Sequence, residues 1–185
     1  MYEKIRNTSL RTLIDFNINS LPVTLSNITD KLGIKILNNS DINVLVTGEY
    51  GATIKFSNSC YIVVDDIYDV SVRRFVIAHE LGHILLGHIA TSNAKYCTIK
   101  NRNPQEQEAD IFAICLLTPE RVLQAIRAIT SEQIAQICNI PLTIAQACAG
   151  HMRAWEVQNK YYLYPLEWQV RQQFSDFIQS QIQKI

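Results

Sequence analysis

The chain has 185 residues, 48% of them hydrophobic and 18% charged, which is enough for a globular fold with a sizeable core. Lys plus Arg and Asp plus Glu each number 17, so no net charge directs the chain to nucleic acid or to an anionic membrane. No stretch has the length of a signal peptide or of a membrane span, so we expect a cytoplasmic protein without membrane contact. The five cysteines lack CxxC spacing, which favours reduced thiols over a disulfide framework.

The N-terminal half predicts short alternating elements. Helices are expected over 3–20 and 24–33, a strand over 34–37, and a hairpin of strands over 51–56 and 60–66. The segment 41–46 has no clear preference. Ser71 is the expected cap of a helix that runs to about Gly87, and residues 89–102 have the composition of a loop.

The C-terminal half predicts helices. Asn103-Pro104 and Thr118-Pro119 are helix-start signals, and further helices are expected over 131–138, over 142–158 and from Pro165 onward. A small sheet followed by helices defines an α+β class. We expect a core over 1–120 with a helical subdomain over 121–185 packed on it, unless both form one single domain.

The predicted helix after Ser71 contains the sequence HELGH. His79 and His83 are four residues apart, so both imidazoles leave the same helix face and can share one divalent metal ion. Glu80 lies about 100° further round the helix, beside the pair, where it can act as general base on water. The sequence therefore predicts an HExxH metal site with Glu80 as the catalytic residue.

The apolar surroundings of this motif support a functional role. The neighbouring residues are hydrophobic nearly all round, which is typical of a buried helix, and a buried polar group without a partner is costly. A buried network of His and Glu satisfied by other protein groups is the alternative. Gly82 indicates either a close neighbour or simple tolerance of glycine. His88 would lie about 140° round from His83, so we expect it to be a polar helix end.

A third metal ligand is expected from the sequence PQEQEAD. Glu106 and Asp110 share one helix face, which suits a metal ligand and a carboxylate that orients a ligating histidine. Glu106 also completes a capping-box pattern with Asn103, so it could instead close the helix start. Glu108 is the other candidate ligand.

These motifs resemble the ImmA/IrrE family of bacterial zinc metallopeptidases. The resemblance rests on HELGHILLGH, on the segment from Glu106 to Pro119, and on the strand CYIVVDD before RRFVIAHELGH. It implies a zincin-like fold, one Zn²⁺ per chain held by His79, His83 and Glu106, and Asp110 as the residue that orients a ligand. It also implies cleavage of a helix-turn-helix repressor, which relieves repression of transcription.

Because the chain begins directly at the peptidase, we expect the repressor to be a separate protein. A monomer is expected, and so is the absence of direct nucleic-acid binding, since the helix-turn-helix rhythm of 131–148 carries little positive charge. His151, Tyr161 and Tyr162 are candidate donors to the oxyanion. A metal-dependent, antirepressor-like module that binds a partner without cutting it is the alternative function. Substrate is expected to add as a strand to an exposed edge of the 51–65 hairpin.

Overall fold

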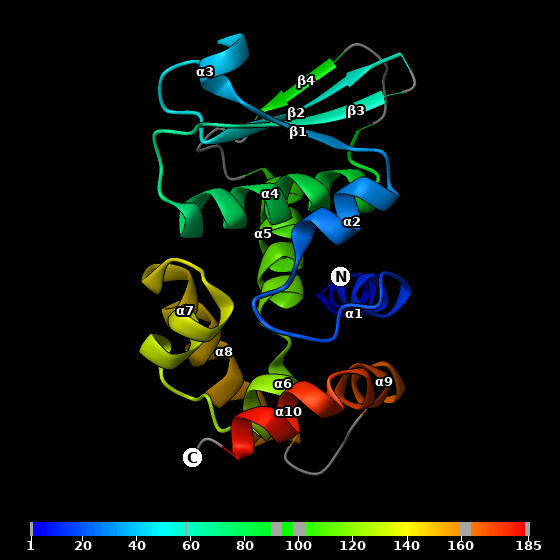
Figure 1. Cartoon of the computed structure of the whole chain (residues 1–185), viewed down its shortest axis with the longest axis vertical. Helices are drawn as coiled ribbons and strands as arrows, with labels where there is room; N and C mark the ends of the chain where they lie inside the picture. Colours follow the sequence, from blue (N-terminus) through cyan, green and yellow to red (C-terminus); the bar gives the residue numbers. More distant parts are fainter. Residues whose placement is uncertain (1, 58, 90–93, 98–102, 160–163, 184–185) are drawn as a thin grey trace.

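The computed structural model describes residues 2–57, 59–89, 94–97, 103–159 and 164–183, with the backbone alone at 94–97, 151 and 153–159. The described residues form ten helices and one four-stranded sheet, so the predicted α+β class is confirmed. The sheet lies at one end of the molecule and the C-terminal helices at the other (Figure 1).

The sheet has the strand order β1-β3-β2-β4. Its strands are β1 (Lys35–Asn38), β2 (Gly51–Phe56), β3 (Ser59–Val64) and β4 (Ala94–Cys97). β2 and β3 form the predicted antiparallel hairpin, while β1 joins β3 in parallel and β4 joins β2 in antiparallel. The prediction of a loop over 89–102 is therefore wrong at 94–97. The hairpin is also not an edge, because both of its strands are paired on their outer sides.

Helix α4 (Val70–Leu85) carries the HELGH sequence and lies directly beneath the sheet (Figure 1). It contacts β2 and β3 on one side and the helix α5 (Pro104–Leu117) on the other, which is why its residues are apolar nearly all round. The predicted cap is wrong by two residues. Asp69, not Ser71, is the N-cap, because its carboxylate accepts hydrogen bonds from the backbone N–H groups of Ser71 and Val72.

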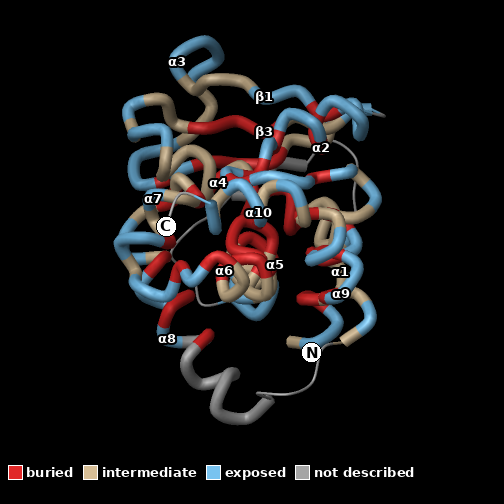
Figure 2. The backbone as a smooth tube through the Cα atoms, turned by 60° about the horizontal axis from the view of Figure 1, so that its bottom comes forward, coloured by how far each residue is buried: buried red, intermediate tan, exposed pale blue. Residues whose placement is uncertain are grey.

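Helix α5 begins under α4 and runs away from the sheet, and its buried residues lie at the centre of the molecule (Figures 1 and 2). Around it stand α1 (Tyr2–Asp15), α2 (Leu25–Lys31), α6 (Glu120–Ala125), α7 (Ser131–Cys138), α8 (Leu142–Asn159), α9 (Pro165–Gln173) and α10 (Ser175–Ile182). A four-residue helix, α3 (Asn39–Ile42), follows β1. It occupies the start of the segment for which the sequence had no preference.

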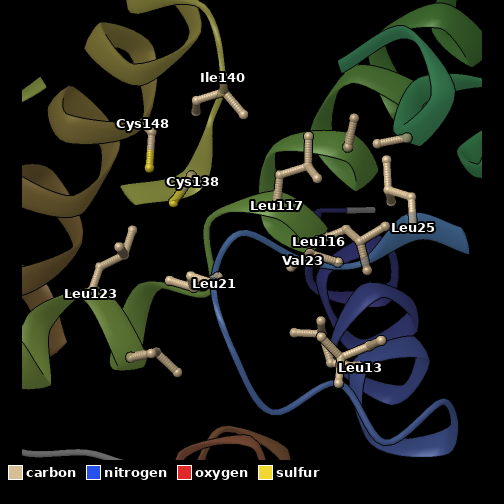
Figure 3. Packing of buried hydrophobic residues seen from close by; sticks show 14 of the residues in the cluster. Leu13, Leu21, Val23, Leu25, Leu116, Leu117, Leu123, Cys138, Ile140 and Cys148 are labelled. Carbon is tan, nitrogen blue, oxygen red and sulfur yellow. The ribbon is translucent and has the colours of Figure 1, made fainter. Parts of the chain in front are cut away.

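The core joins parts of the chain that are far apart in sequence. Leu116 and Leu117 of α5 are buried among Leu13 of α1, Leu25 of α2 and Cys138 of α7 (Figure 3). Burial of these side chains from water is the main stabilising contribution. The four cysteines whose side chains are described, Cys60, Cys115, Cys138 and Cys148, form no disulfide with one another.

Three predicted helix boundaries differ from the structure. α1 ends at Asp15 rather than near residue 20, because Asn17 adopts a left-handed conformation with φ of 54° and turns the chain. α6 begins at Glu120 with Pro119 as its N-cap, since Thr118 still closes α5. The single helix expected from Pro165 is divided into α9 and α10 at Phe174.

Two contacts connect the ends of the chain. α1 packs against α5 and α9, and buried Glu167 of α9 forms ion pairs with Arg6 of α1 and Arg121 of α6. Arg121 Nε lies 3.1 Å from the Glu167 carboxylate.

In the described part of the chain, no helix combines the length and the hydrophobicity that crossing a membrane would require.

Candidate metal centre

The structure brings together three side chains that are separated in sequence. His79 and His83 leave α4 on the same face, and Glu106 reaches them from the first turn of α5. The Nε2 atoms of His79 and His83 lie 3.0 Å apart. The Glu106 carboxylate oxygens lie 3.2 Å from His79 Nε2 and 3.4 Å from His83 Nε2. Both histidines are buried, so this cluster faces little solvent.

Glu106 does not close the start of α5. The side chain of Asn103 accepts a hydrogen bond from the Gln105 N–H, and the Glu106 carboxylate points to the two histidines instead. The capping alternative is therefore wrong. Glu108, the other candidate ligand, lies on a different face of α5 and contacts His88.

The outer nitrogen of His79 has an acidic partner. Asp110 Oδ1 lies 2.8 Å from His79 Nδ1, one turn along α5 from Glu106. A carboxylate only accepts hydrogen bonds, so Nδ1 carries the hydrogen and, in a neutral ring, Nε2 keeps its lone pair. Asp110 thus has the contact that orients a metal-binding histidine.

The three side chains fit a zinc ion. Ligands about 2.0–2.1 Å from a tetrahedral zinc are separated from one another by about 3.3–3.4 Å, and the three separations here are 3.0, 3.2 and 3.4 Å. Two neutral imidazole nitrogens and a carboxylate that converge without a cation would repel one another. The donor set of two nitrogens and one oxygen is one that zinc accepts, and it leaves a fourth position open.

The pKa values of the two histidines move in opposite directions. Burial lowers the pKa of His79, but the hydrogen bonds that its ring donates to Asp110 and Glu106, together with the charge of Glu80, outweigh burial and raise the pKa to about 9. Burial and the charge of neighbouring His79 lower the pKa of His83 to about 4. In the metal-free protein at neutral pH, His79 is therefore protonated and His83 is neutral, and the positive charge of His79 offsets the negative charge of Glu106.

Glu80 lies beside the cluster and is fully buried. Its carboxylate accepts a hydrogen bond of 2.7 Å from the Thr53 hydroxyl of β2. Thr53 was not identified from the sequence, because only the packing of α4 beneath the sheet reveals that the Thr53 side chain faces α4. The hydroxyl fixes one carboxylate oxygen of the expected general base.

Gly82 sits where α4 and α5 cross. A Cβ atom at this position would lie 3.1 Å from Phe112 Cδ1 and 3.2 Å from both Cα and O of Ala109. A close neighbour, one of the two explanations of this glycine, is therefore present, and it is the backbone of the helix that carries Glu106. The close approach of α4 and α5 brings the Glu106 carboxylate within reach of both histidines.

His88 is not simply a polar helix end. Gly87 adopts a left-handed conformation with φ of 78°, and the His88 N–H donates to the His83 carbonyl at 2.9 Å, a Schellman arrangement. The chain therefore turns back after α4. The predicted rotation of about 140° from His83 to His88 assumed that the helix continues to His88. His88 Nδ1 lies 3.0 Å from His83 Nδ1, and His88 Nε2 lies 3.0 Å from Glu108 Oε2. The glycine followed by a histidine was the sequence signal for this turn.

The candidate oxyanion donors are not placed by the structure. Tyr161 and Tyr162 lie outside the described residues, and so does the side chain of His151. The prediction that one of them stabilises the oxyanion stays a prediction.

Comparison with known families agrees with the site. The model of the peptidase M78 family, described as the IrrE N-terminal-like domain, matches residues 29–147. The chain therefore belongs to this family, and the predicted ImmA/IrrE resemblance is confirmed. Membership supports a function of the metallopeptidase type. No curated protein matches the sequence.

Proposed function

We propose that the chain is a zinc-dependent endopeptidase that cleaves a separately encoded helix-turn-helix repressor. The observation that carries the proposal is the cluster of His79, His83 and Glu106 with Glu80 beside it. A bound zinc ion would supply Lewis-acid chemistry, polarising the scissile carbonyl and making water more acidic.

The chain's own residues supply the remaining steps. Glu80 accepts a proton from the attacking water and delivers it to the nitrogen of the departing amine. The hydrogen bond from Thr53 holds the Glu80 carboxylate in one orientation for the proton transfer. Burial of the site keeps bulk water away, which strengthens its electrostatic interactions.

The repressor substrate rests on the family resemblance and places the enzyme in the bacterial cytoplasm. Strand addition of an extended substrate cannot use the inner hairpin, because β1 and β4 cover it. We propose β4 for this contact, since it pairs directly with the strand that carries Thr53 and is the outermost described strand on that side.

The test combines metal analysis with substrate cleavage. Wild-type protein and the Glu80→Gln variant are purified, analysed for zinc, and incubated with repressors encoded in the same genome, and new N-termini are identified by mass spectrometry. We expect about one zinc per chain in both proteins and new N-termini only with wild type, because Gln cannot accept the proton.

Each other result has a defined meaning. Absence of zinc from the wild type after metal loading would refute the metallopeptidase proposal. Zinc in both proteins together with capture but no cleavage of a repressor would support the antirepressor-like binding module. Equal cleavage by both proteins would refute the role of Glu80.

A further inference from the structure

A chain of two hydrogen bonds leads from Glu108 through His88 to His83. Glu108 Oε2 lies 3.0 Å from His88 Nε2, and His88 Nδ1 lies 3.0 Å from His83 Nδ1. The side chain of His88 is 6% exposed and that of Glu108 is 24% exposed. Because these contacts are largely shielded from water, competition from solvent is weak.

We propose that His88 and Glu108 are positioning residues that hold His83 in the tautomer and orientation required for metal binding. The inference rests on the proposed metal centre and extends it by two residues outside the HExxH motif. Neither residue is a metal ligand or touches substrate in this assignment, and both act through His83.

The direction of the hydrogen bonds follows from the chemistry of the groups. The Glu108 carboxylate can only accept, so the hydrogen of a neutral His88 is on Nε2. His88 Nδ1 is then a bare acceptor, and the hydrogen between the two rings belongs to Nδ1 of His83. A neutral His83 with its hydrogen on Nδ1 has its lone pair on Nε2, the atom that faces Glu106 and His79.

The backbone fixes the same contact independently. In a Schellman motif, the residue after the left-handed glycine packs against the residue three before the helix cap. Here these positions hold His88 and His83, and the Gly87 N–H to Ile84 carbonyl bond of 3.2 Å completes the motif. A hydrogen bond between two imidazoles thus takes the place of the usual hydrophobic contact.

The two histidines of the HELGH sequence therefore have different supports. His79 has a direct carboxylate partner in Asp110, whose side chain is 53% exposed. The carboxylate that supports His83 is Glu108, which acts through the nearly buried imidazole of His88. Glu106, Glu108 and Asp110 occupy alternate positions of α5, so a single helix supplies a ligand candidate and the acidic end of both supports.

Matched variants of His88 test the assignment. His88→Asn places an amide oxygen near the position of Nδ1, whereas His88→Leu keeps volume and packing but has no acceptor. Glu108→Gln removes the charge, and Glu132→Gln, at an exposed position in the first turn of α7, is a charge-matched control. Zinc affinity is measured by competition with a chelator, and unfolding of the metal-free proteins is measured by urea denaturation.

We expect His88→Leu and Glu108→Gln to bind zinc about tenfold to a hundredfold more weakly than wild type. His88→Asn should lie between wild type and His88→Leu, and Glu132→Gln should equal wild type. Imidazole ¹⁵N spectra of the four histidines should show a single tautomer for His83 in zinc-loaded wild type and a mixture in Glu108→Gln. If His88→Leu fails to fold, the comparison is made with Glu108→Gln, because the Glu108 side chain is partly exposed and its substitution disturbs packing less.

Equal zinc affinities and unchanged tautomers across all variants would overturn the inference while leaving the zinc centre intact. A wild type that binds no zinc would overturn the inference together with the proposed function. Equal weakening by His88→Asn and His88→Leu would also refute it, because only a packing role would then remain.

Discussion

Gly82→Ala tests how closely α4 and α5 must approach to form the site. The new methyl group would meet Phe112 Cδ1 at 3.1 Å and the backbone of Ala109 at 3.2 Å. Backbone atoms cannot rotate away, so α5 must shift by a few tenths of an ångström. Because Glu106 is one turn before Ala109 on α5, the shift also moves its carboxylate relative to both histidines.

The expected change in stability combines two opposing contributions. Ala in place of Gly stabilises a helix interior by about 1 kcal/mol. Insertion of a methyl group into a packed contact costs about 1–3 kcal/mol. We expect Gly82→Ala to change the free energy of unfolding by between about zero and a loss of about 2 kcal/mol, and to weaken zinc binding.

Gly150→Ala in α8 is the matched control. A Cβ at Gly150 would have no atom within 4 Å, so this variant should gain up to about 1 kcal/mol from the helical contribution alone. The difference between the two variants, measured by urea denaturation of the metal-free proteins, then isolates the packing cost of about 1–3 kcal/mol. Equal stabilisation by both substitutions, with unchanged zinc affinity, would refute the close packing.

Two further predictions concern metal affinity and folding. Metal binding must displace the proton that His79 holds up to a pKa of about 9, whereas His83, with a pKa of about 4, is already neutral. Zinc affinity should therefore rise by about tenfold per pH unit between about pH 6 and 8 and level off above about 9, as measured by chelator competition at each pH. A rise of a hundredfold per unit would show that both imidazoles are protonated. Glu167→Gln leaves Arg6 and Arg121 without their shared carboxylate and should destabilise the protein by about 3 kcal/mol. A loss below about 1 kcal/mol in urea denaturation would contradict this account.

Local sequence patterns predicted many of the elements. Two short strand-like runs separated by the turn residues 57–59 indicated the β2–β3 hairpin, and Asn103-Pro104 indicated the start of α5. These features depend on neighbours in the chain, so the sequence contains their cause. β4 was missed, because a strand of only four residues carries little local signal and forms by pairing with β2.

The sequence by itself determined that α4 offers two candidate metal ligands on one face. Four-residue spacing puts His79 and His83 on one helix face in any fold that makes this segment helical, and the apolar surroundings require that the face be buried. It also confined the remaining acidic candidates to Glu106, Glu108 and Asp110, since these are the carboxylates of one short helical segment.

Only the tertiary structure decided which carboxylate serves which histidine. The crossing of α4 and α5 at Gly82 directs Glu106 to the two Nε2 atoms and Asp110 to the outer nitrogen of His79. The turn at Gly87 returns His88 to His83, and Glu108 meets it from α5. The physical reason is that helix spacing fixes directions around one axis, whereas contacts between two helices depend on how closely and at what angle their backbones pack.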